Sequence, residues 1–197
     1  MARDRIRQLL DRYGVIFREL LEAELPPLRW PRVFRSLRLM EFSGEVVCGR
    51  FFDGIPGLQF ISPATLQSLA AGPDPDAVYW MNAADPASLC GADVEALKAF
   101  LPSRLPTTHL VFHGTELVLV SRRVCRDLLF RVPPDAPRIP DYLGFVKALT
   151  GREQGALAAA RVVTVNGEPV GQSPYRERLL EFGFVDDYLR MSYRARG

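Results

Sequence analysis

The sequence predicts an α+β protein, with an N-terminal winged helix followed by an antiparallel β-rich, barrel-like module with short helices. Three observations support this prediction. Residues 31–42 form an amphipathic helical pattern with arginines on one side. A two-strand pattern follows, and its central loop, residues 53–57, holds two glycines and a proline. Beyond residue 107, apolar strand-like runs alternate with turn residues.

The first two elements are expected to be helices. Apolar residues recur at helical spacing over residues 3–13, and Gly14 ends this first helix. A second helix is expected over residues 16–24, because Phe17 and two leucines can face inward there. Two prolines at positions 26 and 27 end it.

The third helix is the one around which the winged helix is organised. It is expected to begin near Pro31, because a proline in the first helical turn loses no hydrogen bond, and to end near Gly44. At about 100° per residue, the helix divides into an apolar face and a basic face. The apolar face consists of Val33, Phe34, Leu37 and Met40, and the basic face of Arg32, Arg35 and Arg38.

A β-hairpin is expected directly after this helix. Its strands are predicted around residues 46–52 and 58–61 by their β-branched and aromatic content. Residues 53–57 then form an exposed loop, the wing, and Arg50 stands just before it. A short helix over residues 63–71 leads out of the winged helix.

Residues 72–76 are the expected domain boundary, because glycine, prolines and acids suit a solvated linker. The winged helix is thus predicted over residues 1–72 and the second module over residues 73–197. The second module is expected to contain strands at 78–82, 109–112, 117–121, 128–132, 161–165 and 188–193, and helices at 94–100, 142–150 and 174–182.

Composition excludes several classes of function. The chain has 197 residues, 48% of them apolar, and no run long enough to span a bilayer, so a cytoplasmic protein is expected. Three scattered cysteines and two histidines lack the ligand spacing of a structural zinc site, and no metal or cofactor is expected. No P-loop motif is present, so any ATP-driven motor would lie outside this chain.

Several motifs resemble one family. Residues 49–63 resemble the G-x-F-x-x-G-x-x-G-x-Q-F-x-x-P pattern that follows the helicase core in the Lhr (large helicase-related) family of superfamily 2 helicases. Residues 11–20 resemble the family's D-R-Y-G-V-x-x-R-E segment, and residues 166–184 its carboxy-terminal signature. The resemblance implies the carboxy-terminal region of an ATP-dependent DNA helicase acting in DNA repair, with the helicase core domains as partners.

The predicted contact with nucleic acid depends on the arginine-bearing helix and the wing. The net charge is only +2, but five arginines fall between residues 29 and 52, whereas residues 73–103 are acidic. Arg32, Arg35, Arg38 and Arg50 are the candidate contacts to single-stranded or forked DNA, with RNA as an alternative. Trp30 is a further candidate, through base stacking or, alternatively, as a packing residue. The alternative without a binding function is that these arginines form an ordinary solvated surface.

Two other functions are consistent with the sequence. The resemblance extends in overall plan to tandem winged-helix DNA glycosylases, where a carboxylate assists excision of a base such as uracil, and Asp186 and Asp187 are the candidates. The Q-x-Q or Q-x-D signature of those enzymes is absent at Gln154 and Gln172. The other alternative is a protein–protein or oligomerisation module, supported by the acidic stretch and by apolar residues near the wing.

Overall fold

The computed structural model describes residues 2–151 and 157–195. Two compact units divide the chain by their contacts. The first unit comprises Met1–Pro73 and Ala84–Arg104, and the second comprises Asp74–Ala83 and Leu105–Gly197. The chain therefore passes into the second unit at residue 74, returns to the first unit over residues 84–104, and then completes the second unit. The predicted boundary at residue 72 stays a prediction.

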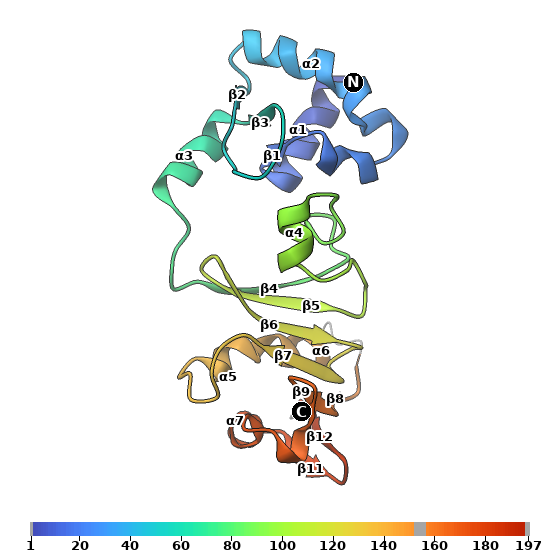
Figure 1. Ribbon diagram of the computed structural model, residues 1–197, viewed down its shortest axis with the longest axis vertical. Coiled ribbons are helices and arrows are strands. Elements are labelled where there is room, and N and C mark those ends of the chain that lie inside the picture. The colour runs from blue at the N-terminus through green and yellow to red at the C-terminus, as the bar shows by residue number, and fades with distance from the viewer. Residues whose placement is uncertain (1, 152–156, 196–197) are drawn as a thin grey trace. The chain divides into compact units, whose positions relative to one another are not determined.

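The first unit has the element order of a winged helix (Figure 1). A three-stranded antiparallel sheet in the order β1-β3-β2 packs with the helices. The elements are α1 (Ala2–Tyr13), β1 (Val15–Ile16), η1 (Glu19–Ala23), η2 (Pro26–Leu28), α2 (Trp30–Phe42), β2 (Val47–Gly49), β3 (Gln59–Ile61), α3 (Pro63–Ala71) and α4 (Glu95–Phe100). The predicted arginine-bearing helix is α2, and the predicted wing is the β2–β3 loop.

The structure differs from the sequence prediction after α1. Residues 16–24 do not form an α-helix: Val15 and Ile16 form a strand that pairs with Ile61 and Phe60 of β3, and a 3₁₀ helix follows. Gly14 explains the change, because its φ of +72° turns the chain sharply at the end of α1. Both β-branched side chains are thereby buried in the sheet.

Helix α2 buries the face that the sequence predicted. Val33, Leu37 and Met40 are buried, and they join a core with Ile6 of α1 and Phe60 of β3. Strand β3 leads directly into α3, whose first turn is capped by Ser62. The Ser62 hydroxyl accepts a hydrogen bond of 3.0 Å from the Thr65 amide.

Residues 84–104 complete the first unit. Val94 is buried in a cluster with Phe17 and Ile61, and Leu97 of α4 packs against the same cluster. The Arg104 guanidinium fixes the preceding loop by donating hydrogen bonds to the carbonyl oxygens of Ser88, Ala84 and Asp85. Part of the acidic stretch is therefore folded against the winged helix.

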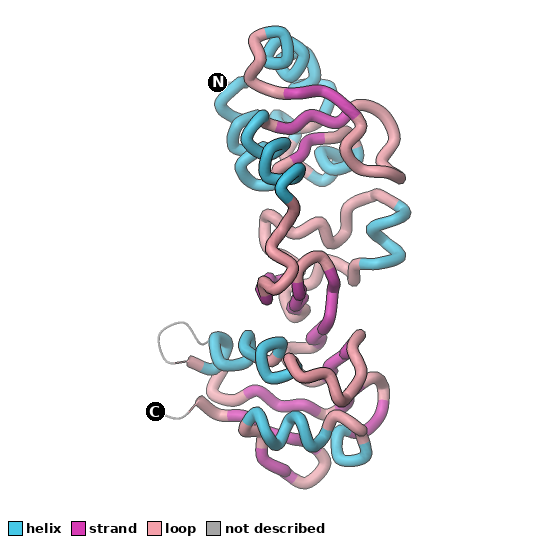
Figure 2. The backbone as a smooth tube through the Cα atoms, turned by 90° about the vertical axis from the view of Figure 1, so that its left-hand side faces the viewer, coloured by secondary structure: helices cyan, strands magenta, loops and turns pink. Residues whose placement is uncertain are grey.

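The second unit contains two open sheets, whose strands are magenta in Figure 2. Strands of the first sheet follow the order β10-β9-β7-β6-β5-β4, and those of the second the order β11-β12-β8. The strands are β4 (Val78–Asn82), β5 (His109–His113), β6 (Glu116–Arg122), β7 (Asp127–Phe130), β8 (Ala160–Val162), β9 (Thr164–Val165), β10 (Glu168–Pro169), β11 (Val185–Asp187) and β12 (Arg190–Tyr193). The α+β class is confirmed, and within the described residues the strands form open sheets, not a closed barrel.

Two predicted elements of the second unit are divided. The helix predicted over residues 142–150 is α5 (Ile139–Tyr142) followed by α6 (Gly144–Thr150). The strand predicted over residues 161–165 contributes β8 to one sheet and β9 to the other. Between them, the Val163 amide donates to the Arg126 carbonyl at 2.8 Å. The remaining helical elements are η3 (Val170–Gln172) and α7 (Arg176–Phe182).

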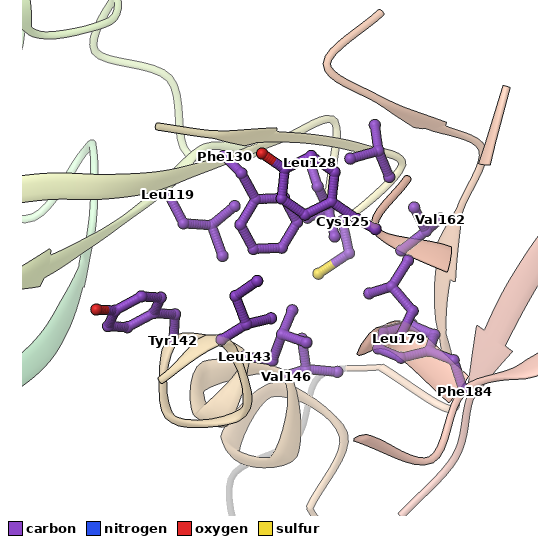
Figure 3. Packing of buried hydrophobic residues seen from close by; sticks show 14 of the residues in the cluster. Leu119, Cys125, Leu128, Phe130, Tyr142, Leu143, Val146, Val162, Leu179 and Phe184 are labelled. Carbon is purple, nitrogen blue, oxygen red and sulfur yellow. The ribbon is translucent and has the colours of Figure 1, made fainter. Parts of the chain in front are cut away.

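The core of the second unit lies between the larger sheet and the helices (Figure 3). Leu143 and Val146 point from the helices toward Leu119 and Cys125 on the sheet side. Phe184, which follows α7, closes the core next to Leu179 and is almost fully buried. The single core joins both sheets, because Val162 of β8 belongs to it as well.

His109 of β5 is buried, and burial lowers its pKa below the ordinary value near 6.5. Its Nδ1 atom has no hydrogen-bond partner among the described residues. Below pH about 6.5 the unfolded chain takes up a proton that buried His109 resists, so the free energy of unfolding should fall as the pH decreases. The variant His109→Gln should make the free energy of unfolding, measured by thermal melts, less dependent on pH between pH 7 and 5.5. An unchanged pH dependence would show that His109 is not its source.

The described residues contain no helix long and apolar enough to cross a bilayer. Nor do they bring three histidine, cysteine, aspartate or glutamate side chains together as metal ligands. Cys48, Cys90 and Cys125 are free thiols.

Candidate nucleic-acid interface

Two of the predicted contact residues lie freely on the outer face of α2. Arg32 and Arg35 are exposed, and neither side chain forms a hydrogen bond or ion pair with another described residue. Arg38 differs, because its half-buried guanidinium forms an ion pair with Glu41 and lies 5.7 Å from the Phe42 ring centroid. Arg32 and Arg35 are therefore available to an external anion, whereas Arg38 is partly neutralised within the helix.

A third free arginine lies beside α2. Arg5 of α1 and Arg32 line the same open hollow of about 360 Å³, together with Pro26, Pro27 and Val33. The Arg5 side chain forms no hydrogen bond or ion pair among the described residues. The sequence predicted no role for Arg5, although its position on the exposed side of the first amphipathic helix was an available signal.

Trp30 belongs to the core side of α2. Its ring is half-buried and lies 5.2 Å from the Phe34 ring and 6.0 Å from the Phe60 ring, centroid to centroid. Such tilted aromatic contacts stabilise the beginning of the helix. In this structure Trp30 therefore holds the arginine-bearing helix against the sheet.

The wing is organised by one buried amide side chain. Gln59 is fully buried, and its Oε1 atom accepts hydrogen bonds from the amides of Phe51 and Phe52 at 2.9 and 3.0 Å. Its Nε2 atom donates to the carbonyls of Phe52 and Ile55 at 2.9 and 3.3 Å. These bonds replace the ladder that would have continued β2, which is why the predicted strand residues 51 and 52 lie in the loop.

The outer side of the wing carries Arg50. This side chain is exposed and lines an open hollow of about 460 Å³ with Phe52, Asp53, Gly54, Ile55 and Pro56. It forms no hydrogen bond or ion pair among the described residues. On the inner side, Phe51 and Ile55 pack against the cluster that includes Val94. The wing is thus supported from within while Arg50 faces outward.

Comparison with known proteins finds similarity to one family. Residues 1–81 match the winged-helix domain of the Large helicase-related protein, Lhr. The chain is also 30% identical, over 185 residues, to the "Lhr helicase/uracil glycosylase" of Escherichia coli (strain K12). Residues 1–81 are an Lhr-type winged-helix domain. The alignment covers 89% of this chain but only 12% of the length of that relative.

The glutamine that organises the wing is part of the Lhr-type motif in residues 49–63. The motif's first glycine also has a steric reason. A Cβ atom at Gly49 would lie 2.9 Å from the Phe51 ring, so a side chain there would displace the ring. The motif therefore encodes the shape of the wing. In the sequence Gln59 stood out only as a member of this pattern, and its place between the apolar residues Leu58 and Phe60 was the available signal for a structural role.

The outer face of the Lhr-type helix α2 also carries apolar side chains. Leu39 is 50% exposed and Phe42 80% exposed, and both follow the arginines along the same face. Exposed apolar residues beside cationic ones are typical of contact surfaces, either with protein or with nucleic acid. The C-terminal end of α2 could therefore contact another protein instead of nucleic acid.

The two candidate catalytic aspartates of the Lhr-type chain lie in β11 and have different partners. The Asp186 carboxylate pairs with Arg176 of α7. The Asp187 carboxylate accepts hydrogen bonds from Arg190 at 2.6 Å and Ser192 at 3.0 Å, which hold its pKa below the ordinary value. Both border an open hollow of about 520 Å³. Because successive strand residues point to opposite faces, they do not form a carboxylate pair. Gln154 lies outside the described residues.

Proposed function

We propose that this chain is a nucleic-acid-binding accessory module of an Lhr-type ATP-dependent DNA helicase that acts in DNA repair in the cytoplasm. The observation that supports the proposal is the set of exposed guanidinium groups on one winged helix, namely Arg5, Arg32, Arg35 and Arg50. Each has no ion-pair partner among the described residues. Guanidinium groups in this state bind phosphate strongly and cost little to desolvate.

The proposed contact follows the general use of such helices. The exposed face of α2 would contact phosphates and base edges, and the wing would contact the neighbouring backbone through Arg50. Arg38 contributes less, because Glu41 already neutralises it. The helicase core domains of the full-length protein would supply the ATP-driven motor.

Direct binding measurements test this function. The affinity of the purified chain for fluorescein-labelled single-stranded DNA, forked DNA and RNA should be measured by anisotropy over a salt series. We expect binding that weakens steeply with salt, as counterion release from phosphates requires. Light scattering on the same sample determines whether the chain is an oligomer. A stable oligomer without affinity for nucleic acid would favour the protein-contact alternative.

A second candidate function is excision of uracil. The Escherichia coli relative carries this activity in its name, and Asp187 is an ionised carboxylate beside the 520 Å³ hollow. Hydrolysis of an N-glycosidic bond passes through an oxocarbenium-like state, which a nearby negative charge stabilises. Both aspartates are ion-paired, Asp186 with Arg176 and Asp187 with Arg190. Asp187 is tested first, because its hydrogen bonds lower its pKa and keep the carboxylate ionised.

The variant Asp187→Asn should lower the rate of uracil excision by a factor of about 100 or more, because it removes the stabilising charge. The measurement is alkali cleavage of a uracil-containing oligonucleotide after incubation with the chain. Asp186→Asn should be compared in the same assay, and Asp11→Asn on the exposed side of α1 serves as the control. The absence of alkali-labile product from the unmodified chain would remove this candidate function.

A further inference from the structure

A second arginine-rich surface lies within the second unit. Arg123, Arg126, Arg161 and Arg190 line one open hollow of about 330 Å³. The adjoining 520 Å³ hollow shares Arg161 and Arg190 and adds Arg194. We call these five arginines the arginine surface. It is formed by the β6–β7 turn and by the sheet β11-β12-β8, far in sequence from α2.

The carboxylates nearby neutralise only part of this surface. Arg123 pairs with Asp127, and Arg190 pairs with Asp187. Asp186 is engaged by Arg176. The side chains of Arg126, Arg161 and Arg194 form no hydrogen bond or ion pair with any described residue. Three guanidinium groups over two adjoining hollows are therefore free of direct ion pairs, and only the longer-range attraction of Asp127 to Arg126 and of Asp187 to Arg161 offsets their charge.

The fold determines the direction of these side chains. Ser192 pairs with Arg161 and Asp187 pairs with Arg190 in the register of the small sheet. Strand alternation places these residues on one face, while Val162 and Met191 are buried on the other. The core therefore holds the arginine-bearing face outward.

The turn that carries Arg123 and Arg126 has an unusual backbone. Arg123, Val124 and Cys125 are consecutive non-glycine residues with φ of 50°, 56° and 67°. This left-handed conformation is unfavourable for residues with a Cβ atom, above all for β-branched valine. Burial of Cys125 in the core fixes the turn. Strain of this kind is retained where a site requires it.

A second strained turn lies at the tip of the β11–β12 hairpin. Tyr188 has a φ of 60°, and its side chain is 98% exposed. Leu189, next to it, is 76% exposed. The register pairs Asp187 with Arg190, so Tyr188 and Leu189 form a two-residue turn directly beside the arginine surface. An aromatic ring so exposed offers its surface to a planar partner.

We propose that the arginine surface and Tyr188 form a second contact site for single-stranded nucleic acid. Phosphates bind Arg126, Arg161 and Arg194, and an unstacked base stacks on the Tyr188 ring. Paired guanidinium and aromatic contacts match alternating phosphates and bases, whereas an acidic peptide gives the ring no planar partner. The site goes beyond the proposed winged-helix contact and uses none of its residues.

The double variant Arg126→Glu with Arg161→Glu tests the phosphate contacts in the full chain. Its affinity for fluorescein-labelled single-stranded oligothymidylate should fall by a factor of about 10 or more, with a shallower salt dependence. Arg161→Glu alone should be compared with Arg18→Glu, an exposed arginine of the first unit with the same charge change. Unchanged affinity in a double variant with an unchanged circular dichroism spectrum would overturn the proposal.

Photocrosslinking tests the role of Tyr188 separately. An oligonucleotide containing 5-bromouracil should crosslink to the peptide that contains Tyr188, and Tyr188→Ala should abolish this product while Tyr188→Phe retains it. Crosslinks confined to the winged helix would overturn the inference and leave the proposed function intact. Affinity lost in the arginine-surface variants but not in the variants of α2 would support the second site and overturn the proposed winged-helix contact. A chain without measurable affinity would overturn both.

Discussion

Replacing Arg32 and Arg35 together with glutamate should weaken binding to single-stranded or forked DNA by a factor of about 10 to 100. Both guanidinium groups lie on the outer face of α2 without an internal partner. The substitution removes two phosphate contacts and places two negative charges on the same face. Neither side chain contributes to the core, so the fold should be retained.

The salt dependence gives the sharper readout. Each phosphate contact contributes a slope of about 0.7 to 0.9 in the plot of log affinity against log salt, so the double variant should lose about 1.4 to 1.8 units of slope. Each single variant should be compared with Arg18→Glu, which makes the same charge change elsewhere in the first unit. Equal losses of affinity in Arg35→Glu and Arg18→Glu would show that only the net charge of the chain matters. Unchanged affinity in the double variant would refute the claim that the outer face of α2 contacts DNA.

The variant Gln59→Leu should lower the free energy of unfolding by about 2–4 kcal/mol, because it leaves several loop groups without hydrogen-bond partners. The amides of Phe51 and Phe52 and the carbonyl of Ile55 all bond to the Gln59 side chain in a buried setting. Leucine has a similar size but offers no donor or acceptor. Urea denaturation, followed by circular dichroism, measures the loss.

The matched control for this variant is Gln67→Leu on the exposed surface of α3, which should change the free energy of unfolding by less than about 0.5 kcal/mol. Gln59→Leu should also reduce affinity for DNA, because Arg50 loses its position when the wing loosens. A Gln59→Leu chain as stable as the unmodified protein would show that water satisfies the loop groups and that the wing has another support.

The sequence predicted the winged helix well because its signals are local. Pro31 and the arc of Val33, Leu37 and Met40 placed α2 within one residue of its observed start. Glycines and proline likewise located the wing. The strand β1 was missed because two residues have no period of their own, and their pairing with β3 depends on a segment 44 positions away, as the pair Ile16 and Phe60 illustrates.

Long-range contacts account for what the sequence left open. Whether residues 84–104 pack on the winged helix depends on the burial of Val94, which has no local signature. The adjacent aspartates 186 and 187 read as a pair in the sequence, yet strand alternation gives them different partners. The arginine surface was not recognised, because Arg126, Arg161 and Arg194 lie in separate segments that only the fold brings together.

The central claim is that the outer face of α2 and the wing contact nucleic acid. Nuclear magnetic resonance titration of the isotope-labelled chain with a short single-stranded oligonucleotide tests it most directly. We expect the amide shifts in the first unit to concentrate at Arg32, Arg35 and residues 50–57. Shifts that spare these positions at saturating oligonucleotide, or that fall only on Leu39, Phe42 and the acidic segment 84–104, would contradict it.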